Sequence, residues 1–432
     1  MLKLKWLMKN NKHFDYVIVG TGIMSALAYK KILNSRRTVK IINLNGLPDL
    51  HNNKNNKFNF KRGTIYYGLG GTSNIWSSTY DFYPKGYLPP NLEEKLSDEN
   101  LKSVETILDY FNVPIVELQN ISNRRESFFM KNIGSSNVNF AIRNKNLFNF
   151  SKIFEAKDLI NLHIDNFNID NTEKTIENLL SNEKFSYETL LLAAGGIGNP
   201  FLINKYFNKN KNNGKNYMNH LKFSPLIFET KKLLRIKTVT GTSNLKNFEI
   251  IPTYLIKNDE ENLLHSFRIY TSLRTDTNTK ASFINLIFDK IFRKFGFSKY
   301  YKILIYTDMK PATNSLKFED ETVILNTSED STIQNISKSI DEIKNLLKEH
   351  TKVRKIYEEN NYAINEGSHH IGTTIMGESL DESVVNTSLE LHGSSNVKVI
   401  GTSVLPLAGS GHPTLTAMIL TILELDKEIN DW

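Results

Sequence analysis

Two short stretches near the end of the chain carry histidines in settings suited to proton transfer. Gly367–Thr374 contains His369, and Gly409–Thr416 contains His412. The apolar run Val397–Ile400 between them has the composition of a buried strand. Because histidine titrates near neutral pH, a positioned imidazole can accept or donate a proton during a reaction. We therefore expect two imidazoles, presented from loops that flank one strand, to form a reactive pair.

The first element expected to position such a pair lies near the N-terminus. Tyr16–Val19 is an apolar run that leads into Gly20-Thr21-Gly22, and apolar residues at helical spacing follow. Gly20 permits a tight turn, Gly22 lets the backbone approach a pyrophosphate, and the small Ser25 lets helix and strand pack closely. The helix N-terminus would offer free N–H groups to the phosphates. This strand, turn and helix predict a dinucleotide-binding unit.

The strand that follows departs from the usual pattern. Val39–Ile42 ends in Asn43, where dinucleotide-binding folds usually carry an acidic residue that bonds the ribose. A second glycine loop, Gly68–Trp76, adds hydroxyl and amide side chains to adjacent glycines, which suits close contact with a flat cofactor or a phosphate. Thr189–Pro200 then repeats the strand-then-glycine pattern. We expect it to contain a later strand of the same parallel sheet.

The other segments carry no catalytic signature. Asn100–Phe111 has helical spacing, and the alternating segments within Leu159–Leu180 predict a small antiparallel meander. From Leu221 to about Ala363, alternating strands and amphipathic helices such as Ile333–Leu347 predict an α+β insertion. We expect this insertion to be a substrate-binding domain.

The composition is that of a globular protein with a sizeable core: 432 residues, 40% hydrophobic and 11% aromatic. The sequence has no cysteine, which excludes disulfides, thiolate catalysis and cysteine metal sites, and it gives no indication of another metal site. The net charge is +8, but Lys, like Asn, is plentiful along the whole chain, which indicates a compositional bias rather than a binding stripe, so we expect no nucleic-acid partner. Phe288–Phe295 is aromatic and basic, and it predicts either an ordinary amphipathic helix or a contact with a membrane or partner. With no apolar run of about 20 residues and no signal-peptide pattern, we expect a cytoplasmic protein.

Several separated motifs together resemble the glucose–methanol–choline (GMC) family of flavin-dependent oxidoreductases. They occur in the family's order over nearly the whole chain, and the C-terminal ones are the most specific. The motifs are Gly20-Thr21-Gly22, Gly70-Gly71-Thr72-Ser73-Asn74, Ala193-Ala194-Gly195, Gly214–His220, His369–Thr373, Ser383–Val385, His392-Gly393, Gly401-Thr402-Ser403 and His412–Thr416. The residues of the C-terminal motifs look most like those of bacterial sugar and polyol members of the family. The chain is shorter than typical members, mainly in the substrate domain.

The resemblance implies an FAD-dependent enzyme that oxidises the CH–OH group of a sugar, polyol or other alcohol to a carbonyl, with hydride transfer to flavin N5. His369 maps onto the family's proton-abstracting base, and His412 onto the residue that holds the substrate oxygen. The helix that begins at Pro413 would direct positive potential at the flavin and favour its anionic reduced form. His370 is expected to be structural and His392 a turn residue, and His220 has no assigned role. Predicted cofactor contacts are Gly20, Gly22, Ser25, Asn43, Gly70, Gly71, Thr72, Ser73, Asn74, Ala194, Gly195, Gly401, Thr402, Pro413 and Thr414.

Two alternative functions remain open: a lyase of the same fold that keeps its flavin, and a flavin-binding subunit without a reaction of its own. Some relatives attach the flavin covalently through a histidine, but the corresponding residue here is Ile75. Attachment by that route is therefore excluded, and we expect non-covalent FAD. The substrate would be a small alcohol or sugar, and the electron acceptor is not specified by the sequence.

The motif order also predicts how the chain is divided. An FAD-binding α/β domain of Rossmann-like type, completed by the C-terminus, would comprise residues 13–80, 150–222 and 366–432. An inserted α+β substrate-binding domain would comprise residues 81–149 and 223–365. The two histidines would then lie where the chain returns to the first domain.

Overall fold

The computed structural model describes residues 12–52, 65–76, 78–84, 86–122, 138–144, 148–207, 210–235, 248–258, 263–271, 297–311, 313–319, 322–349, 352–359, 362–409 and 411–430. The basic and aromatic stretch Phe288–Phe295 and the N-terminal residues up to 11 lie outside these ranges. The prediction of a helix or of a contact with a membrane or partner at Phe288–Phe295 therefore stays a prediction. Within the described ranges, no helix is long and apolar enough to cross a membrane.

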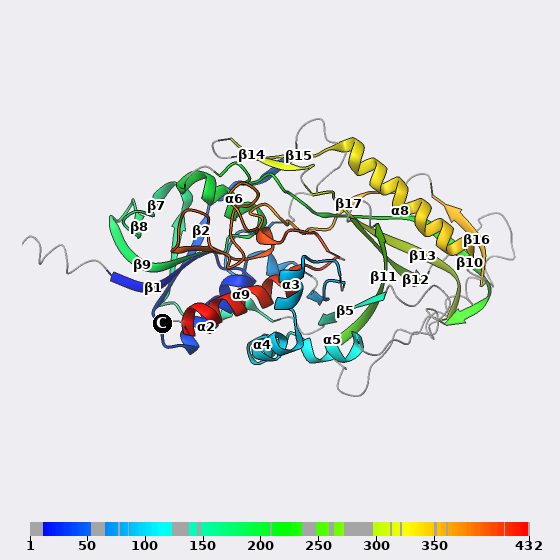
Figure 1. Ribbon diagram of the computed structural model, residues 1–432, viewed down its shortest axis with the longest axis horizontal. Helices are drawn as coiled ribbons and strands as arrows, with labels where there is room; N and C mark the ends of the chain where they lie inside the picture. The colour runs from blue at the N-terminus through cyan, green and yellow to red at the C-terminus, as the bar shows by residue number, and fades with distance from the viewer. Residues whose placement is uncertain are drawn as a thin grey trace, which may run out of the picture.

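A seven-stranded sheet forms one half of the molecule (Figure 1). Its strands β6, β2, β1, β9 and β18 run parallel, while β7 and β8 continue from β9 in antiparallel pairing. The strands are β1 (Lys12–Val19), β2 (Val39–Asn45), β6 (Leu159–His163), β7 (Phe167–Asp170), β8 (Thr175–Asn178), β9 (Glu183–Leu192) and β18 (Val397–Val399). Residues of β1, β2 and β9 are fully buried near their C-terminal ends, as expected for strands covered on both faces.

Most predictions about this sheet are confirmed. β9 and β18 pair in parallel, so the late strand Val397–Val399 does complete a sheet whose first strand lies at the N-terminus. The predicted meander is only partly right, because β6 pairs in parallel with β2 and only β7 and β8 form antiparallel pairs. Asn43 does not end its strand, since β2 continues to Asn45 and its pairing with β6 reaches that residue.

Helices cover this sheet and connect its distant parts. α2 (Ile23–Asn34) packs against the C-terminal helix α9 (Thr414–Asn430), and α4 (Asp98–Tyr110) packs against both (Figure 1). α6 (Gly195–Tyr206) follows β9 and contacts the 3₁₀ turn η6 (Thr402–Val404). The remaining short helices are α3 (Pro90–Lys95), α5 (Ile115–Ser122), η1 (Gly71–Asn74), η3 (Phe150–Lys152) and η4 (Ile164–Asn166).

An eight-stranded sheet, antiparallel in its pairings, forms the other half. α8 (Glu329–Glu349), the long yellow helix in Figure 1, packs on β13, β16 and β10. The strands are β4 (Thr79–Tyr80), β5 (Val138–Asn144), β10 (His220–Arg235), β11 (Phe248–Asn258), β12 (Leu263–Thr271), β13 (Phe297–Asp308), β16 (Val353–Glu358) and β17 (Asn365–Glu366). β10 and β13, two paired neighbours in this sheet, are long strands that the sequence patterns did not indicate.

The two halves are joined at several places. β3 (Leu50–Asn52) pairs in parallel with β15 (Thr322–Asn326), which also pairs with β14 (Ser315–Glu319). Thr79–Tyr80 and His220–Lys222 belong to the eight-stranded sheet, whereas the predicted domain limits place them with the FAD-binding segments. The division into two domains stays a prediction, with these shared strands at its limits.

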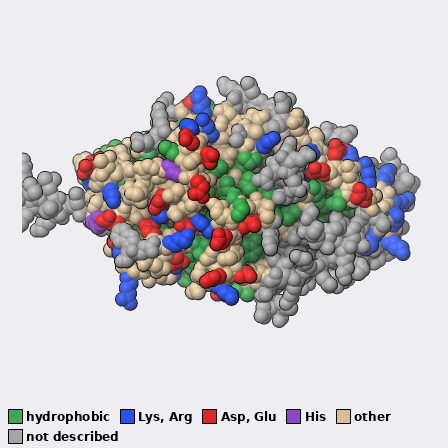
Figure 2. All heavy atoms as spheres, in the orientation of Figure 1, with side chains coloured by type: hydrophobic (Ala, Val, Ile, Leu, Met, Phe, Trp, Pro, Cys, Tyr) green, Lys and Arg blue, Asp and Glu red, His purple; other side chains and the backbone are tan. Residues whose placement is uncertain are grey.

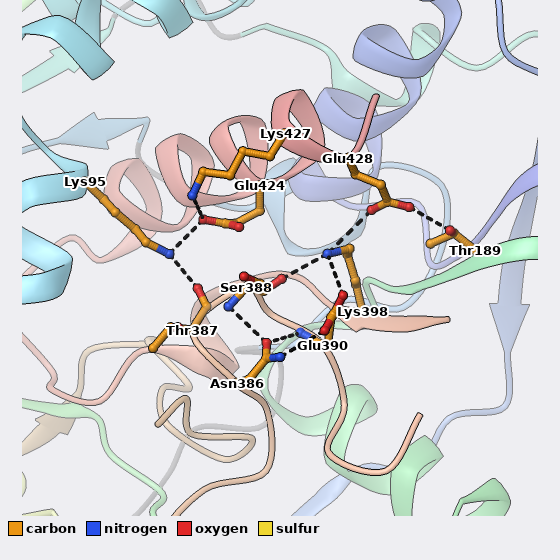
Figure 3. A network of polar contacts seen from close by, with 10 residues as sticks. All are labelled: Lys95, Thr189, Asn386, Thr387, Ser388, Glu390, Lys398, Glu424, Lys427 and Glu428. Atoms are coloured by element: carbon orange, nitrogen blue, oxygen red, sulfur yellow. Dashed lines mark hydrogen bonds and ion pairs between the residues drawn. The ribbon is translucent and has the colours of Figure 1, made fainter. Parts of the chain in front are cut away.

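A polar network fixes the returning C-terminal segment to the sheet (Figure 3). Glu424 of α9 is buried and accepts hydrogen bonds from Lys95 and Lys427. On the next turn, Glu428 accepts a hydrogen bond from Thr189 of β9 and lies 3.5 Å from the ammonium of Lys398, the middle residue of β18. These contacts tie α3, β9, β18 and α9 together, and so they hold the segment on which His412 lies.

Charged side chains of both signs lie on the face of the molecule shown in Figure 2. On the face shown in Figure 2, acidic and basic side chains are interspersed over the described surface rather than collected in one stripe. Ion pairs such as Lys211–Asp381 and Lys344–Glu358 join residues of opposite sign on that surface.

Candidate active site

Glycine turns form the walls of a cavity of about 650 Å³ at the carboxyl ends of β1, β2 and β9. Its volume falls in the range of sites for small molecules and cofactors. Gly20 has φ of +120°, and a Cβ there would lie 2.4 Å from the carbonyl oxygen of Ala193. A Cβ on Gly71, which has φ of +55°, would lie 2.9 Å from the Cα of Gly22. The two glycine loops therefore touch at positions where side chains have no room.

The cavity has the features that a dinucleotide needs. α2 begins at Ile23 after Gly22, without a side-chain cap and without an acidic residue in its first turn. Gly22, Ile23 and Met24 all line the cavity. The first N–H groups of α2 thus face this space with the positive end of the helix dipole, which favours a phosphate group. The residues present fit the adenine dinucleotide that the sequence predicts.

Asn43 lies on the cavity wall but is also held by the protein. Its Oδ1 accepts a hydrogen bond of 2.9 Å from the hydroxyl of Thr21, and its Nδ2 donates one of 2.8 Å to Oδ1 of Asn161. A carboxamide has one more N–H to donate and a second lone pair on its oxygen. An asparagine at this position can therefore fix the turn at Thr21 and still present a donor to the cavity.

Most of the other predicted cofactor contacts lie on the same wall. Those that line it are Gly20, Gly22, Asn43, Gly71, Thr72, Ser73, Ala194, Gly195, Gly401, Thr402 and Thr414. Four predicted contacts are not among the lining residues: Ser25, Gly70, Asn74 and Pro413. Ser25 is fully buried in α2, Gly70 donates its N–H to Thr21, and Asn74 donates to the carbonyl of Leu69. The carbonyl of Pro413 accepts the N–H of Ala417 and so starts α9.

The structure brings His369 and His412 together at the edge of this cavity. Both rings line it, and their centroids are 5.8 Å apart with an angle of 73° between the ring planes. His369 follows β17 after a turn in which Ser368 has a left-handed φ of +62°. His412 lies just before α9. Two imidazoles at this separation can contact the same small substrate.

His369 is buried in a setting that keeps it neutral. Its backbone N–H donates to Oδ1 of Asn219 at 3.1 Å, and its Nδ1 is buried without a hydrogen-bond partner among the described residues. Burial, with a smaller contribution from the neighbouring His220 and His412 rings, lowers the pKa of His369 well below its usual range. An imidazole that is unprotonated at neutral pH is able to accept a proton.

His412 is held between two charged residues. Its Nδ1 lies 3.2 Å from Oδ2 of Asp81 and 3.5 Å from a terminal nitrogen of Arg268. Burial lowers the pKa of His412, while the carboxylate of Asp81 opposes this shift and Arg268 adds to it. Since Nδ1 is engaged in these contacts, Nε2 is the ring nitrogen left for a ligand in the cavity.

Sequence reasoning did not identify Asp81 or Arg268. Asp81 follows the two-residue strand β4, and Arg268 is a single basic residue within the alternating pattern of β12. The guanidinium of Arg268 also contacts Thr253 and lies 4.9 Å from the ring centroid of Tyr306. Both residues are nearly fully buried. A charged residue that is buried in or next to a strand can indicate a functional site. The sequence does not show which residues are buried, because burial depends on how the strands pair.

The other histidines take different positions. His370 also lines the cavity; its ring shares a hydrogen bond of 3.0 Å with Tyr217, and its carbonyl accepts from Thr402. Its structural role stays a prediction. Nε2 of His392 lies 2.8 Å from the hydroxyl of Ser383 in a turn. His220, which had no assigned role, packs its ring against that of His369.

The parallel sheet, its glycine turns and the return of the C-terminus define an FAD-binding Rossmann-like fold of the kind found in flavoprotein oxidases. Residues 320–421 match the family model of GMC oxidoreductases, so the resemblance inferred from the motifs is confirmed. No curated protein matches the sequence.

Three solved structures illustrate the likeness in fold. A formate oxidase structure is 12% identical with a TM-score of 0.56 and covers 98% of this chain and 99% of its own. A variant of the formate oxidase of Aspergillus oryzae, studied for FAD modification, is 13% identical with a TM-score of 0.57 and covers 97% and 98%. The pyridoxine 4-oxidase of Mesorbium loti is 12% identical with a TM-score of 0.56 and covers 97% and 99%.

Proposed function

We propose that the protein is an FAD-dependent oxidoreductase that oxidises the CH–OH group of a sugar, polyol or other small alcohol to a carbonyl. The observation that carries this proposal is the placement of His369 and His412, 5.8 Å apart, on the wall of a cavity built by dinucleotide-type glycine turns. The GMC family match and the oxidase names of the structural neighbours support flavin-dependent oxidoreduction. The neighbours are named for two different substrates, so the substrate is proposed from the site alone.

The two histidines divide the work of activating a hydroxyl group. His369 accepts the hydroxyl proton, because its lowered pKa keeps it unprotonated before the reaction. His412 holds the substrate oxygen by a hydrogen bond donated from Nε2 of its imidazolium form, which the carboxylate of Asp81 at Nδ1 favours. Bound FAD supplies the redox chemistry by taking up the hydride. In balance, the alcohol loses one proton to the protein and one hydride to the cofactor, and it becomes a carbonyl compound.

FAD would be held by residues on three separate elements. The N-terminus of α2 and the Gly20 turn suit the pyrophosphate, and Asn43 replaces the usual acidic partner of the ribose. Gly71–Ser73 and Thr402 add hydroxyl and backbone groups from two other segments that line the cavity. Since Ile75 occupies the position where some relatives carry the histidine that attaches the flavin, the cofactor is proposed to be non-covalent.

An anaerobic titration tests the proposal. The purified yellow protein is mixed without oxygen with a panel of sugars, polyols and simple alcohols, and the flavin absorption band is monitored. Bleaching by a member of the panel, with the carbonyl product identified by mass spectrometry, is the expected result. If no compound bleaches the flavin and cyanohydrins are cleaved instead, the protein is a lyase. If neither reaction occurs, it is a flavin-binding subunit.

A further inference from the structure

Two buried nitrogen atoms next to the reactive pair have no hydrogen-bond partner among the described residues. They are Nε2 of His220 and Nδ1 of His369. Each belongs to a ring that faces the other, with centroids 5.1 Å apart and planes at 80°. Leaving either nitrogen unpaired inside the protein is costly, because its hydration is lost and not replaced. The two unpaired atoms therefore call for a common explanation.

The separation of the rings is that of two imidazoles joined by one hydrogen bond. An N–H···N bond spans about 3 Å between the nitrogens, and each nitrogen lies about 1 Å from its ring centre, which gives a centroid separation of about 5 Å. The observed 5.1 Å agrees with this value.

The far side of His220 decides which nitrogen donates. Its Nδ1 lies 2.7 Å from Oδ1 of Asp308, and Oδ2 of Asp308 accepts a hydrogen bond of 2.7 Å from the hydroxyl of Tyr87. His220 and Asp308 are both essentially inaccessible to solvent. Burial raises the pKa of Asp308, and the hydrogen bonds that it accepts from His220 and Tyr87 oppose this shift by favouring the carboxylate. A carboxylate accepts rather than donates, so Nδ1 of His220 carries the proton. In the neutral ring, Nε2 is then an acceptor that faces His369.

A shared contact fixes the backbones of the two histidines relative to each other. Oδ1 of Asn219 accepts the N–H of His220 at 2.8 Å and the N–H of His369 at 3.1 Å. Nδ2 of Asn219 donates to Glu366 and to the hydroxyl of Tyr217, so the carboxamide has a single orientation. The segment Gly214–His220, which the sequence could not interpret, thus supports the loop that carries His369.

From these contacts we infer that Asp308, His220 and His369 form a hydrogen-bonded chain in which His369 donates from Nδ1 and keeps Nε2 unprotonated toward the cavity. His220 and Asp308 are positioning residues, because they act through His369 and touch neither substrate nor cofactor. This inference rests on the proposed function, in which His369 is the proton acceptor. No proton leaves Asp308 or His220 during the reaction; the chain fixes the tautomer of the base and stabilises the imidazolium that forms.

The tautomer can be read without any reaction. In the holoenzyme labelled with ¹⁵N only at histidine, a long-range ¹⁵N–¹H correlation spectrum shows which ring nitrogen of each histidine carries the proton. The signals of His369 are assigned by their loss in His369→Gln. We expect His369 to be protonated at Nδ1 and unprotonated at Nε2 in the wild type. A proton on Nε2 of His369 in the wild type would overturn the inference.

Two variants test the dependence on the chain. His220→Phe keeps a ring of similar size and removes the acceptor, and Asp308→Asn allows an amide N–H to donate to Nδ1 of His220, which turns Nε2 of His220 into a donor. In either variant, the proton of His369 should move to Nε2 for at least part of the population. His369 signals that stay unchanged in a folded His220→Phe or Asp308→Asn protein would contradict the chain. His392→Gln, in a turn away from the cavity, is the matched control and should leave these signals unchanged.

Kinetics separate this inference from the proposed function. Once a substrate is known, His220→Phe should lower the rate constant of flavin reduction about tenfold to a hundredfold with little change in KM. If the wild type oxidises no alcohol but the tautomer is as expected, the proposed function fails and the chain stands. If alcohols are oxidised and the tautomer is the opposite one, the chain fails and the proposed function stands.

Discussion

Oδ2 of Asp81 lies 3.2 Å from Nδ1 of His412, although the two residues are 331 positions apart in the sequence. Asp81 directly follows the strand β4, which joins the second glycine loop to the eight-stranded sheet. His412 lies in the loop that leads into α9. The contact therefore connects both halves of the molecule at the edge of the cavity, and it gives His412 one defined orientation.

Replacing Asp81 should impair the reaction without removing the cofactor. In Asp81→Asn the negative charge that favours the imidazolium form of His412 is lost, so Nε2 holds the substrate oxygen less well. We expect flavin reduction to slow about tenfold to a hundredfold. Stopped-flow reduction of the variant measures this directly, with the exposed Asp381→Asn as control. Reduction of Asp81→Asn at the wild-type rate over the whole pH range would show that Asp81 has no such role.

The buried carboxylate of Glu424 should matter for stability rather than for chemistry. In Glu424→Ala, the ammonium of Lys95, which is 17% exposed, loses its counter-ion at 2.7 Å. Breaking a buried pair in this way typically costs about 3 kcal/mol of unfolding free energy. Lys427→Ala removes the 59% exposed partner of the same carboxylate and should cost less than about 1 kcal/mol. Denaturant titrations of the two variants measure the difference, and equal losses would contradict the account of this network.

Unfolding free energy should rise with pH between about 4 and 6.5. Burial lowers the pKa of His265 from 6.5 to about 4, and it also lowers the pKa values of His369 and His412. Below pH 6.5 the unfolded chain binds protons that the folded protein does not, so stability falls by about 1.4 kcal/mol per pH unit for each such group. Above pH 6.5 this contribution is constant.

His265→Gln isolates one part of that dependence. Its unfolding free energy should change less steeply between pH 4 and 6.5 than that of the wild type, by about 1.4 kcal/mol per pH unit. Chemical denaturation at a series of pH values gives both slopes. His13→Gln is a suitable control, because the His13 side chain is about half exposed. Parallel pH curves for wild type and His265→Gln would mean that His265 is not held neutral by burial.

The flavin should leave the protein on denaturation. Ile75 lines the cavity and is 54% exposed, and it has no nucleophilic atom that could attach to the flavin. After acid precipitation and centrifugation, the yellow colour should be found in the supernatant. Colour that stays with the washed precipitate would contradict non-covalent binding and would require attachment through another residue.

Local patterns allowed the parallel sheet to be predicted, but not the surroundings of the histidines. The turn at Gly20 and the strand Val397–Val399 are encoded in short runs, because a glycine turn after an apolar strand depends only on neighbouring residues. Asp308 and His220 are 88 positions apart and meet only because β13 pairs with β10. Arg268 likewise meets His412 across separate segments. Such contacts follow from long-range strand pairing, which no local spacing indicates.

The boundaries of the elements also depend on long-range pairing that local sequence patterns do not indicate. Asn43 was placed at the end of its strand from the apolar run alone, but pairing with β6 carries β2 on to Asn45. Ser25 and Asn74 were assigned to the cofactor by motif, yet neither lines the cavity: Ser25 is buried in α2, and the exposed Asn74 donates to the carbonyl of Leu69. A motif indicates which turn is present, whereas packing decides which of its side chains reach the cavity.

The central claim is that His369 is the proton acceptor in the oxidation of an alcohol. The most direct test is the rate of anaerobic flavin reduction by a saturating alcohol substrate in the wild type, His369→Gln and the control His392→Gln. We predict that His369→Gln remains folded and yellow but that its flavin is reduced more slowly, by a factor of about a hundred or more, while His392→Gln matches the wild type. Reduction of His369→Gln at the wild-type rate would contradict the assignment of the base.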